Sequence, residues 1–148
     1  EFDLPFDHEG EIAASGNINH ELLLALNDLD FYKKEGAKSL GIEWVKKEFW
    51  PIIASFSSLS DADKMATLSE HIALQIATIL NINNIENVLV TGGGTFNHFL
   101  INNIKSKSDC RRIGALCGGI SIARGSGVIY RCIRSRRLSF YSRLVYLK

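Results

Sequence analysis

Three consecutive glycines, Gly92, Gly93 and Gly94, are the residues of this chain whose type and spacing best suit binding chemistry. They follow a short apolar run, Val88–Val90, and precede a polar residue, Asn97, that can begin a helix. Because glycine has no Cβ, this backbone can adopt positive φ angles and approach a flat or charged ligand closely. The amides would then lie near a helix N-terminus, where the backbone dipole favours a phosphate or ribose oxygen. The pattern predicts a nucleotide-binding turn.

The glycine run alone leaves a second interpretation open. It lacks the G-x-G-x-x-G spacing of dinucleotide-binding turns, and no Gly-Lys-Ser/Thr follows it as in a P-loop. A tight connection from a strand to a helix, with no ligand, would produce the same local pattern. The elements around the glycines must therefore decide between a nucleotide-binding turn and a connection without a ligand.

The chain before the glycines is predicted to be mainly helical. Leucines recur at helical spacing over Asn19–Leu29, with Asn19 as the N-cap. A second helix is expected over Ile42–Phe49, ended by Pro51. The longest helix is expected over Ala62–Leu80, capped by Ser60. Its predicted apolar stripe, wide enough for a core or interdomain helix, consists of Met65, Leu68, Ile72, Ile76, Ile79 and Leu80.

The elements next to the glycines complete an α/β pattern. The continuous apolar character of Val88–Val90 is typical of a central strand covered on both faces. After the glycines, one face of a helix is expected to carry Phe96, Phe99, Leu100 and Ile104. The order helix, strand, glycine turn, helix therefore predicts an α/β fold.

Length and composition place the chain among globular proteins. Its 148 residues, 46% of them hydrophobic, fit one domain with a sizeable core. No run of eighteen apolar residues occurs, and the first residues are acidic rather than basic and then apolar. We therefore expect neither a secretion signal nor a membrane partner.

The formal net charge of +1 hides two unlike segments. Residues 1–109 contain all sixteen acidic residues, eight lysines and no arginine, for a net charge of −8. Residues 110–148 contain all eight arginines, one lysine and no acid, for a net charge of +9, together with all three cysteines. The composition predicts a boundary between Asp109 and Cys110.

Four segments in a fixed order carry a more specific signal: Phe6–Ala13 with Gly16, Lys38–Glu43, Ala66–Ser69, and Val90–Asn97. Together they resemble the C-terminal half of the anhydro-N-acetylmuramic acid kinase family, over about residues 3–109. The resemblance implies the actin-like ATPase fold of sugar kinases, in which two ribonuclease-H-like domains clasp ATP. Residues 1–109 would then be the C-terminal part of the ATPase domain, and residues 110–148 a basic tail that does not match.

The resemblance also implies an activity. Such kinases are cytoplasmic enzymes of cell-wall recycling that use ATP, Mg²⁺ and water. They open the 1,6-anhydro ring of anhydro-N-acetylmuramic acid and phosphorylate O6, giving N-acetylmuramic acid 6-phosphate. By the same resemblance Gly92, Gly93, Gly94 and Asn97 would lie against the adenosine or its phosphates, and the enzyme would be a homodimer. Asn97 could equally be a helix-surface residue.

The catalytic parts of the family lie upstream of the segment that begins at Phe6. The phosphate-binding hairpin and the catalytic aspartate have no counterpart here, so no catalytic residue is assigned and the chain alone is expected to be inactive. Asp7 matches a downstream position of the family and is not expected to be catalytic. Lys38 could neutralise a lactyl carboxylate or a phosphate. The alternative is a helix start, with Ser39 as N-cap and Lys38 solvated.

Histidines and cysteines give no metal signal. His8, His20, His71 and His98 lack metal-binding spacing with the cysteines, so no metal ligand is assigned. His71 is expected to be a core or flank residue of the long helix. Cys110, Cys117 and Cys132 contain no C-x-x-C pair and are expected to be free thiols.

The basic tail admits two explanations. Read one base later, degenerate codons for residues 133–140 permit an acidic and apolar segment of the kind with which the family continues, so the tail is hypothesised to be translated out of frame. Alternatively, the chain is a non-catalytic nucleotide-binding or interaction fragment whose basic arm contacts nucleic acid. No nucleic-acid-binding motif appears in the tail, which disfavours that partner.

Overall fold

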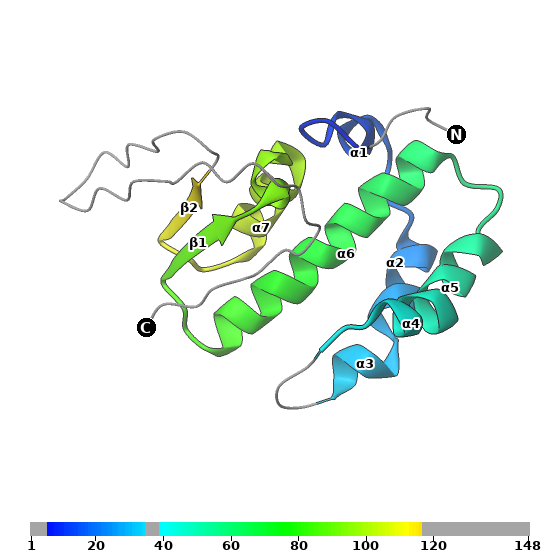
Figure 1. The fold of residues 1–148 in the computed structure, drawn as a ribbon, viewed down its shortest axis with the longest axis horizontal. Helices are drawn as coiled ribbons and strands as arrows, with labels where there is room; N and C mark the ends of the chain where they lie inside the picture. Colours follow the sequence, from blue (N-terminus) through cyan, green and yellow to red (C-terminus); the bar gives the residue numbers. More distant parts are fainter. Residues whose placement is uncertain (1–5, 35–38, 117–148) are drawn as a thin grey trace.

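The computed structural model describes residues 6–34 and 39–116. A long helix, α6, runs between a group of short helices and a βαβ unit (Figure 1). In chain order the elements are α1 (Glu11–Ser15), α2 (His20–Asn27), α3 (Asp30–Lys33), α4 (Ile42–Trp44), a π-helical turn (Val45–Phe49), α5 (Trp50–Ser55), α6 (Asp61–Ile82), β1 (Asn87–Thr91), a 3-10 turn (Gly93–Phe96), α7 (His98–Lys107) and β2 (Arg112–Leu116). This mixture of helices and parallel strands is compatible with the predicted α/β class. None of the described helices combines the length and the apolar character needed to cross a bilayer.

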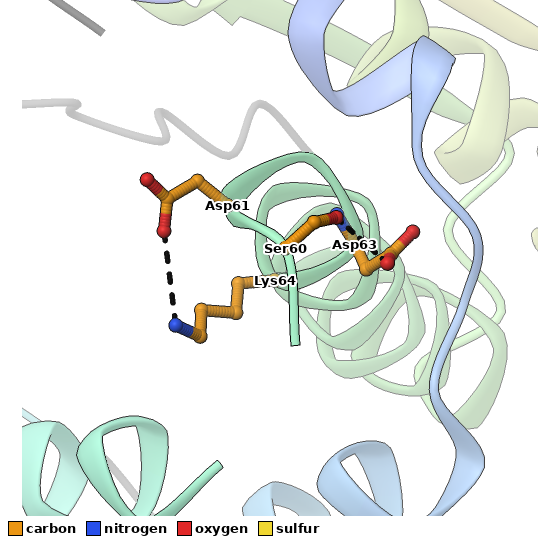
Figure 2. A network of polar contacts seen from close by, with 4 residues as sticks. All are labelled: Ser60, Asp61, Asp63 and Lys64. Carbon is orange, nitrogen blue, oxygen red and sulfur yellow. Dashed lines mark hydrogen bonds and ion pairs between the residues drawn. The ribbon is translucent and has the colours of Figure 1, made fainter. Parts of the chain in front are cut away.

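Helix α6 begins at the cap that the sequence predicts. The Ser60 hydroxyl oxygen accepts a hydrogen bond from the Asp63 amide at 3.1 Å and donates to the Asp63 carboxylate at 2.7 Å. Lys64 lies 3.7 Å from the Asp61 carboxylate in the same first turn (Figure 2). These bonds occupy part of the polar groups that a helix start leaves open. The helix continues two residues past the predicted end at Leu80.

The predicted apolar stripe of α6 is wrong in part. Leu80 is buried, but Ile72 and Ile79 are 42% and 40% exposed. The buried positions are mostly small or polar: Ala66, Thr67, Ser69, His71, Ala73, Ala77 and Leu80. Small side chains let the neighbouring helices α1, α2 and α7 approach this face, so contact with several partners decides which face is buried.

Close approach is clearest where the link after α1 crosses α6. A Cβ on Gly16 would collide with the Ala62 carbonyl and lie 2.7 Å from the Asp63 amide nitrogen. Glycine at this position therefore lets the link between α1 and α2 lie directly on the first turn of α6.

Pro51 does not end the helix that precedes it. The Val45 carbonyl accepts from the Trp50 amide, five residues on, and Pro51 lies in the first turn of α5. In a regular α-helix the proline ring would collide with the carbonyl four residues earlier, and the wider π turn relieves that contact. The start of this helix also differs from the sequence interpretation, because Gly41 rather than Ser39 is the N-cap.

Strand β1 pairs with β2 in parallel, with Asn87 opposite Arg112 and Leu89 opposite Gly114. Helix α7 connects the two strands. The core between this unit and α6 is formed by Ala73, Leu80 and Ile104, with Ile76, Ile85, Val88, Leu100, Cys110 and Ile113 packed against it. The described fold thus continues past the change of composition after Asp109.

The apolar face predicted after the glycines needs one correction. Phe96 ends the 3-10 turn and is 53% exposed, so it does not share the buried face of α7. Ile101 and Ile104 are the buried residues of that helix. The 3-10 turn displaces Phe96 from the helical register that the sequence pattern assumes.

Candidate functional site

The glycine turn is held from inside by Thr95. Gly92 has φ +86°, a conformation that favours glycine. Its carbonyl accepts two hydrogen bonds from buried Thr95, one from the amide at 3.2 Å and one from the hydroxyl at 2.7 Å. Both bonds fix the direction of the chain as it leaves β1.

The outer side of the turn is open. Gly92, Gly93 and Gly94 are exposed, and a Cβ built on any of them meets no described atom within 4 Å. Only Gly92 has a left-handed φ. The described residues therefore give no steric reason for glycine at positions 93 and 94. A ligand that approaches the backbone closely would supply one.

Asn97 begins the helix after the turn. Its Oδ1 accepts from the Leu100 amide at 2.8 Å, which makes it the N-cap of α7. Its own amide donates to the Gly94 carbonyl at 3.2 Å, so the cap is joined directly to the glycine turn. In the same first turn the Phe99 amide donates outside the helix, to the Glu9 carbonyl at 3.4 Å. Asn97 thus has a structural role, and its contact with a ligand stays a prediction.

A second segment lies beside the turn, although it comes from the start of the chain. The Asp7 carboxylate accepts from the amides of Ile12 at 2.9 Å and Ala13 at 3.2 Å, which caps α1. The Glu9 carbonyl accepts from the Phe99 amide at 3.4 Å. Asp7 is therefore a capping residue in this structure, and its lack of a catalytic role stays a prediction.

The segment Ala66–Ser69 lies in α6 and contacts the link between α1 and α2. The Thr67 hydroxyl oxygen accepts from the Asn19 amide at 2.9 Å and donates to the Asp63 carbonyl at 2.7 Å. The Asp63 carboxylate accepts from the Asn17 amide at 2.6 Å. Hydrogen bonds from the Asn17 amide and the Ser60 hydroxyl lower the pKa of Asp63. These contacts hold the link between α1 and α2 on α6.

The sequence model of the anhydro-N-acetylmuramic acid kinase family matches residues 1–114. This chain belongs to that family. The anhydro-N-acetylmuramic acid kinase of Hahella chejuensis is 36% identical over 96 residues, which cover 64% of this chain and 26% of that kinase. That of Albidiferax ferrireducens is 36% identical over 101 residues, covering 66% of this chain and 26% of the relative. That of Pseudomonas paraeruginosa is 34% identical over 117 residues, which cover 74% of this chain and 31% of the relative.

The chain spans about a quarter to a third of the length of these curated kinases. The match passes the change of composition after Asp109 and includes the first residues of β2. The division into residues 1–109 and 110–148 stays a prediction. So do the frame change and the basic arm, because residues 117–148 lie outside the described part of the chain.

Three other polar residues considered from the sequence are Lys38, Ser39 and His71. Ser39 is exposed ahead of α4, and Lys38 lies outside the described residues. His71 is 1% exposed, and its Nδ1 donates to Asn27 Oδ1 at 2.8 Å. Burial lowers the pKa of His71 to about 4, so the ring is neutral near pH 7. His71 is a core residue, as predicted.

Metal-binding groups do not gather in the part of the chain that the structure describes. No three His, Cys, Asp or Glu side chains come together among those residues. The Cys110 thiol is free and donates to the Ile85 carbonyl at 2.8 Å. Cys117 and Cys132 lie outside the described residues.

A pocket of about 500 Å³ is lined by residues of α2, α3, α4, the π turn and α5. These short helices lie on the other side of α6 from β1 and α7 (Figure 1). The pocket lining mixes aromatic and charged side chains, including Phe31, Trp44, Asp28 and Lys34. None of the residues that the family resemblance points to for nucleotide binding lines it. We therefore take the glycine turn, rather than this pocket, as the candidate site.

Sequence reasoning missed two residues that shape this site, Thr95 and Gly10. Both belong to segments that carry the family resemblance. A glycine between two charged residues, Glu9 and Glu11, is a turn signal that could have drawn attention to Gly10. Nothing in the local sequence predicts that this turn lies against α7.

Proposed function

We propose that this chain carries the adenosine side of the ATP-binding surface of an anhydro-N-acetylmuramic acid kinase with the actin-like fold. The observation that carries the proposal is the open glycine turn at the N-terminus of α7, in a chain of this family. Gly92, Gly93 and Gly94 present backbone without side chains. The first turn of α7 adds partial positive charge for a ribose or phosphate oxygen. Asn97, which follows the turn and caps α7, would contact the same ligand.

The cofactors of the complete enzyme would be ATP and Mg²⁺. The open turn fits the nucleotide, because no Cβ at these positions would be crowded by the described protein, so the free space is available to a ligand. Among the described residues, no three His, Cys, Asp or Glu side chains come together that could hold a metal ion. We therefore assign the described residues binding and orientation of the nucleotide, and no step through the metal.

The substrate of the complete enzyme would be 1,6-anhydro-N-acetylmuramic acid, phosphorylated at O6 in the cytoplasm by a homodimer. The relatives are named for this activity, and this chain spans about a quarter to a third of their length. The groups that activate water and hold the transferred phosphate would lie in the remaining part. This chain alone would bind nucleotide and not phosphorylate the sugar.

Titration of the chain with a fluorescent ATP analogue tests the nucleotide surface. The variants Gly94→Ala and Gly94→Val place side chains of increasing size in space that no described atom fills, at a φ outside the left-handed region. We expect the fold to be kept, and the affinity to fall with side-chain size, by tenfold or more for valine.

The matched control is Gly114→Ala, whose Cβ would make ordinary contact with Leu89 Cδ1 at 3.6 Å in the sheet. It should bind the analogue as the unaltered chain does. Equal affinity for Gly94→Val and the unaltered chain would refute the proposed surface.

A further inference from the structure

The turn before α1 has an unusual backbone. Glu9 has φ +55° and Gly10 has φ +82°, so two successive residues are left-handed, one of them with a side chain. A non-glycine residue keeps such a conformation only where its surroundings enforce it. Two contacts do so here. The Asp7 carboxylate holds the first amides of α1 on one side, and the Phe99 amide binds the Glu9 carbonyl on the other.

The turn formed by Glu9 and Gly10 packs so closely against the first turn of α7 that a side chain at Gly10 would collide with it. A Cβ on Gly10 would collide with Asn97 Oδ1 and lie 2.7 Å from Phe99 Cβ. The Glu9 carboxylate also lies 3.5 Å from His98 Nδ1. Three consecutive residues at the start of α7 thus contact the turn formed by Glu9 and Gly10.

Asn97 connects the turn at Gly10 to the three glycines through its own hydrogen bonds. Its side chain caps α7 through Leu100, and its amide donates to the Gly94 carbonyl. A displacement of the Asn97 side chain disturbs the cap on Leu100, and a displacement of its backbone also moves the amide that bonds to Gly94. Since Ile101 and Ile104 pack α7 into the core and Thr95 holds the Gly92 carbonyl, we expect the exposed Gly93–Gly94 end of the turn to shift.

We infer that Asp7 and Gly10 are positioning residues, which set the geometry of the Gly92–Gly94 turn through Asn97. The structural coupling stands on these contacts alone. Its consequence for ATP rests on the proposed function.

The coupling is tested by the backbone amide signals of Gly92, Gly93 and Gly94 in ¹H–¹⁵N NMR spectra of the full chain. Gly10→Ala should shift these signals, because the new methyl group displaces Asn97. Gly16→Ala is the matched control, since its Cβ would collide with Ala62 at the other end of α1. It should lower stability and leave the glycine signals in place. Unmoved glycine signals in folded Gly10→Ala would overturn the inference, and so would equal shifts in both variants.

Two further variants keep the test decisive if Gly10→Ala does not fold. Asp7→Asn keeps the shape of the side chain but weakens the cap of α1, and should shift the same glycine signals by less. Asn97→Ser keeps an N-cap with a shorter side chain, and should reduce the effect of Gly10→Ala when the two are combined. No shift in Asp7→Asn, or strict additivity in the double variant, would count against the coupling.

Nucleotide titration of the same variants separates this inference from the proposed function. If both hold, Gly10→Ala binds the fluorescent ATP analogue several-fold more weakly than Gly16→Ala does. If the glycine signals move but neither the unaltered chain nor any variant binds the analogue, the proposed function fails and the coupling stands. If the unaltered chain binds and Gly10→Ala binds equally well with unmoved signals, the coupling fails.

Discussion

At the residue scale, Thr95 is the side chain that most directly shapes the candidate site. It is buried behind the glycines and gives the Gly92 carbonyl two hydrogen bonds. A buried hydroxyl usually finds a partner, and here the partner is the backbone of the turn itself. The turn is thus rigid on its inner side and open on its outer side, which is a preorganised arrangement for a ligand.

Thr95→Val tests this role. Valine fills nearly the same volume but loses the 2.7 Å hydrogen bond to the Gly92 carbonyl, so we expect the free energy of unfolding to fall by about 1 kcal/mol. Nucleotide affinity should fall as well, because the turn loses one of its two inner bonds. Urea unfolding and ATP-analogue titration measure the two effects. Thr78→Val, which removes an exposed hydroxyl bonded to Leu74 on α6, should change neither by much.

At the element scale, His71 joins α6 to the short helices. Its Nδ1 donates to Asn27 at the end of α2, and its ring contacts Tyr32 of α3 and Phe49 of the π turn. Its Nε2 is buried without a hydrogen-bond partner among the described residues. A charged imidazolium would therefore be poorly accommodated at this junction.

This burial predicts a pH dependence of stability. Because the pKa of His71 is lowered from 6.5 to about 4, the unfolded chain binds the proton more readily than the folded chain between these values. Stability should be constant above pH 6.5 and fall as the pH drops towards 4, by roughly 3 kcal/mol in total. Urea unfolding at a series of pH values measures the slope. His71→Leu should flatten it and exposed His20→Ala should not; an unchanged slope in His71→Leu would contradict the prediction.

The sequence predicts those elements whose signals are local. The caps Asn19, Ser60 and Asn97 each act within three residues, and the first two are predicted correctly as caps. The buried face of α6 is not predictable in this way, because small residues such as Ala66 and Ala73 are buried by helices distant in sequence. Pro51 misleads for a related reason, since a π turn changes the local rule. The open side of the glycine turn can be predicted from its glycines. The contact between the turn at Gly10 and Asn97 cannot, because it joins distant parts of the chain.

At the scale of the whole molecule, the chain matches only part of each of its longer relatives. Its sheet has two strands within the described residues, and α6 carries isoleucines that are substantially exposed there. Parallel sheets are normally larger and covered on both faces. The relatives are three to four times longer than the segment they share with this chain, as their matched fractions indicate. The nucleotide surface that we propose would therefore be one side of a larger site.

The chain alone should not catalyse phosphorylation of the sugar. We expect the purified chain to release no ADP from ATP in response to 1,6-anhydro-N-acetylmuramic acid, measured with a coupled ADP assay. The full-length kinase of Hahella chejuensis serves as the positive control under the same conditions. Sugar-dependent ADP release by the chain alone, abolished in Gly94→Val, would show that the catalytic groups are present after all.

The contact between Gly10 and Asn97 also bears on how the molecule assembles. The two residues lie about ninety positions apart, so their contact closes most of the described chain into a loop. Closing so long a loop is entropically unfavourable until the helices between its ends have packed. The turn at Gly10 should therefore dock late in folding, after α6 and α7 have met, and the glycine turn should reach its final geometry only in that last step. Mutations at Gly10 would then mainly speed unfolding and leave the folding rate nearly unchanged.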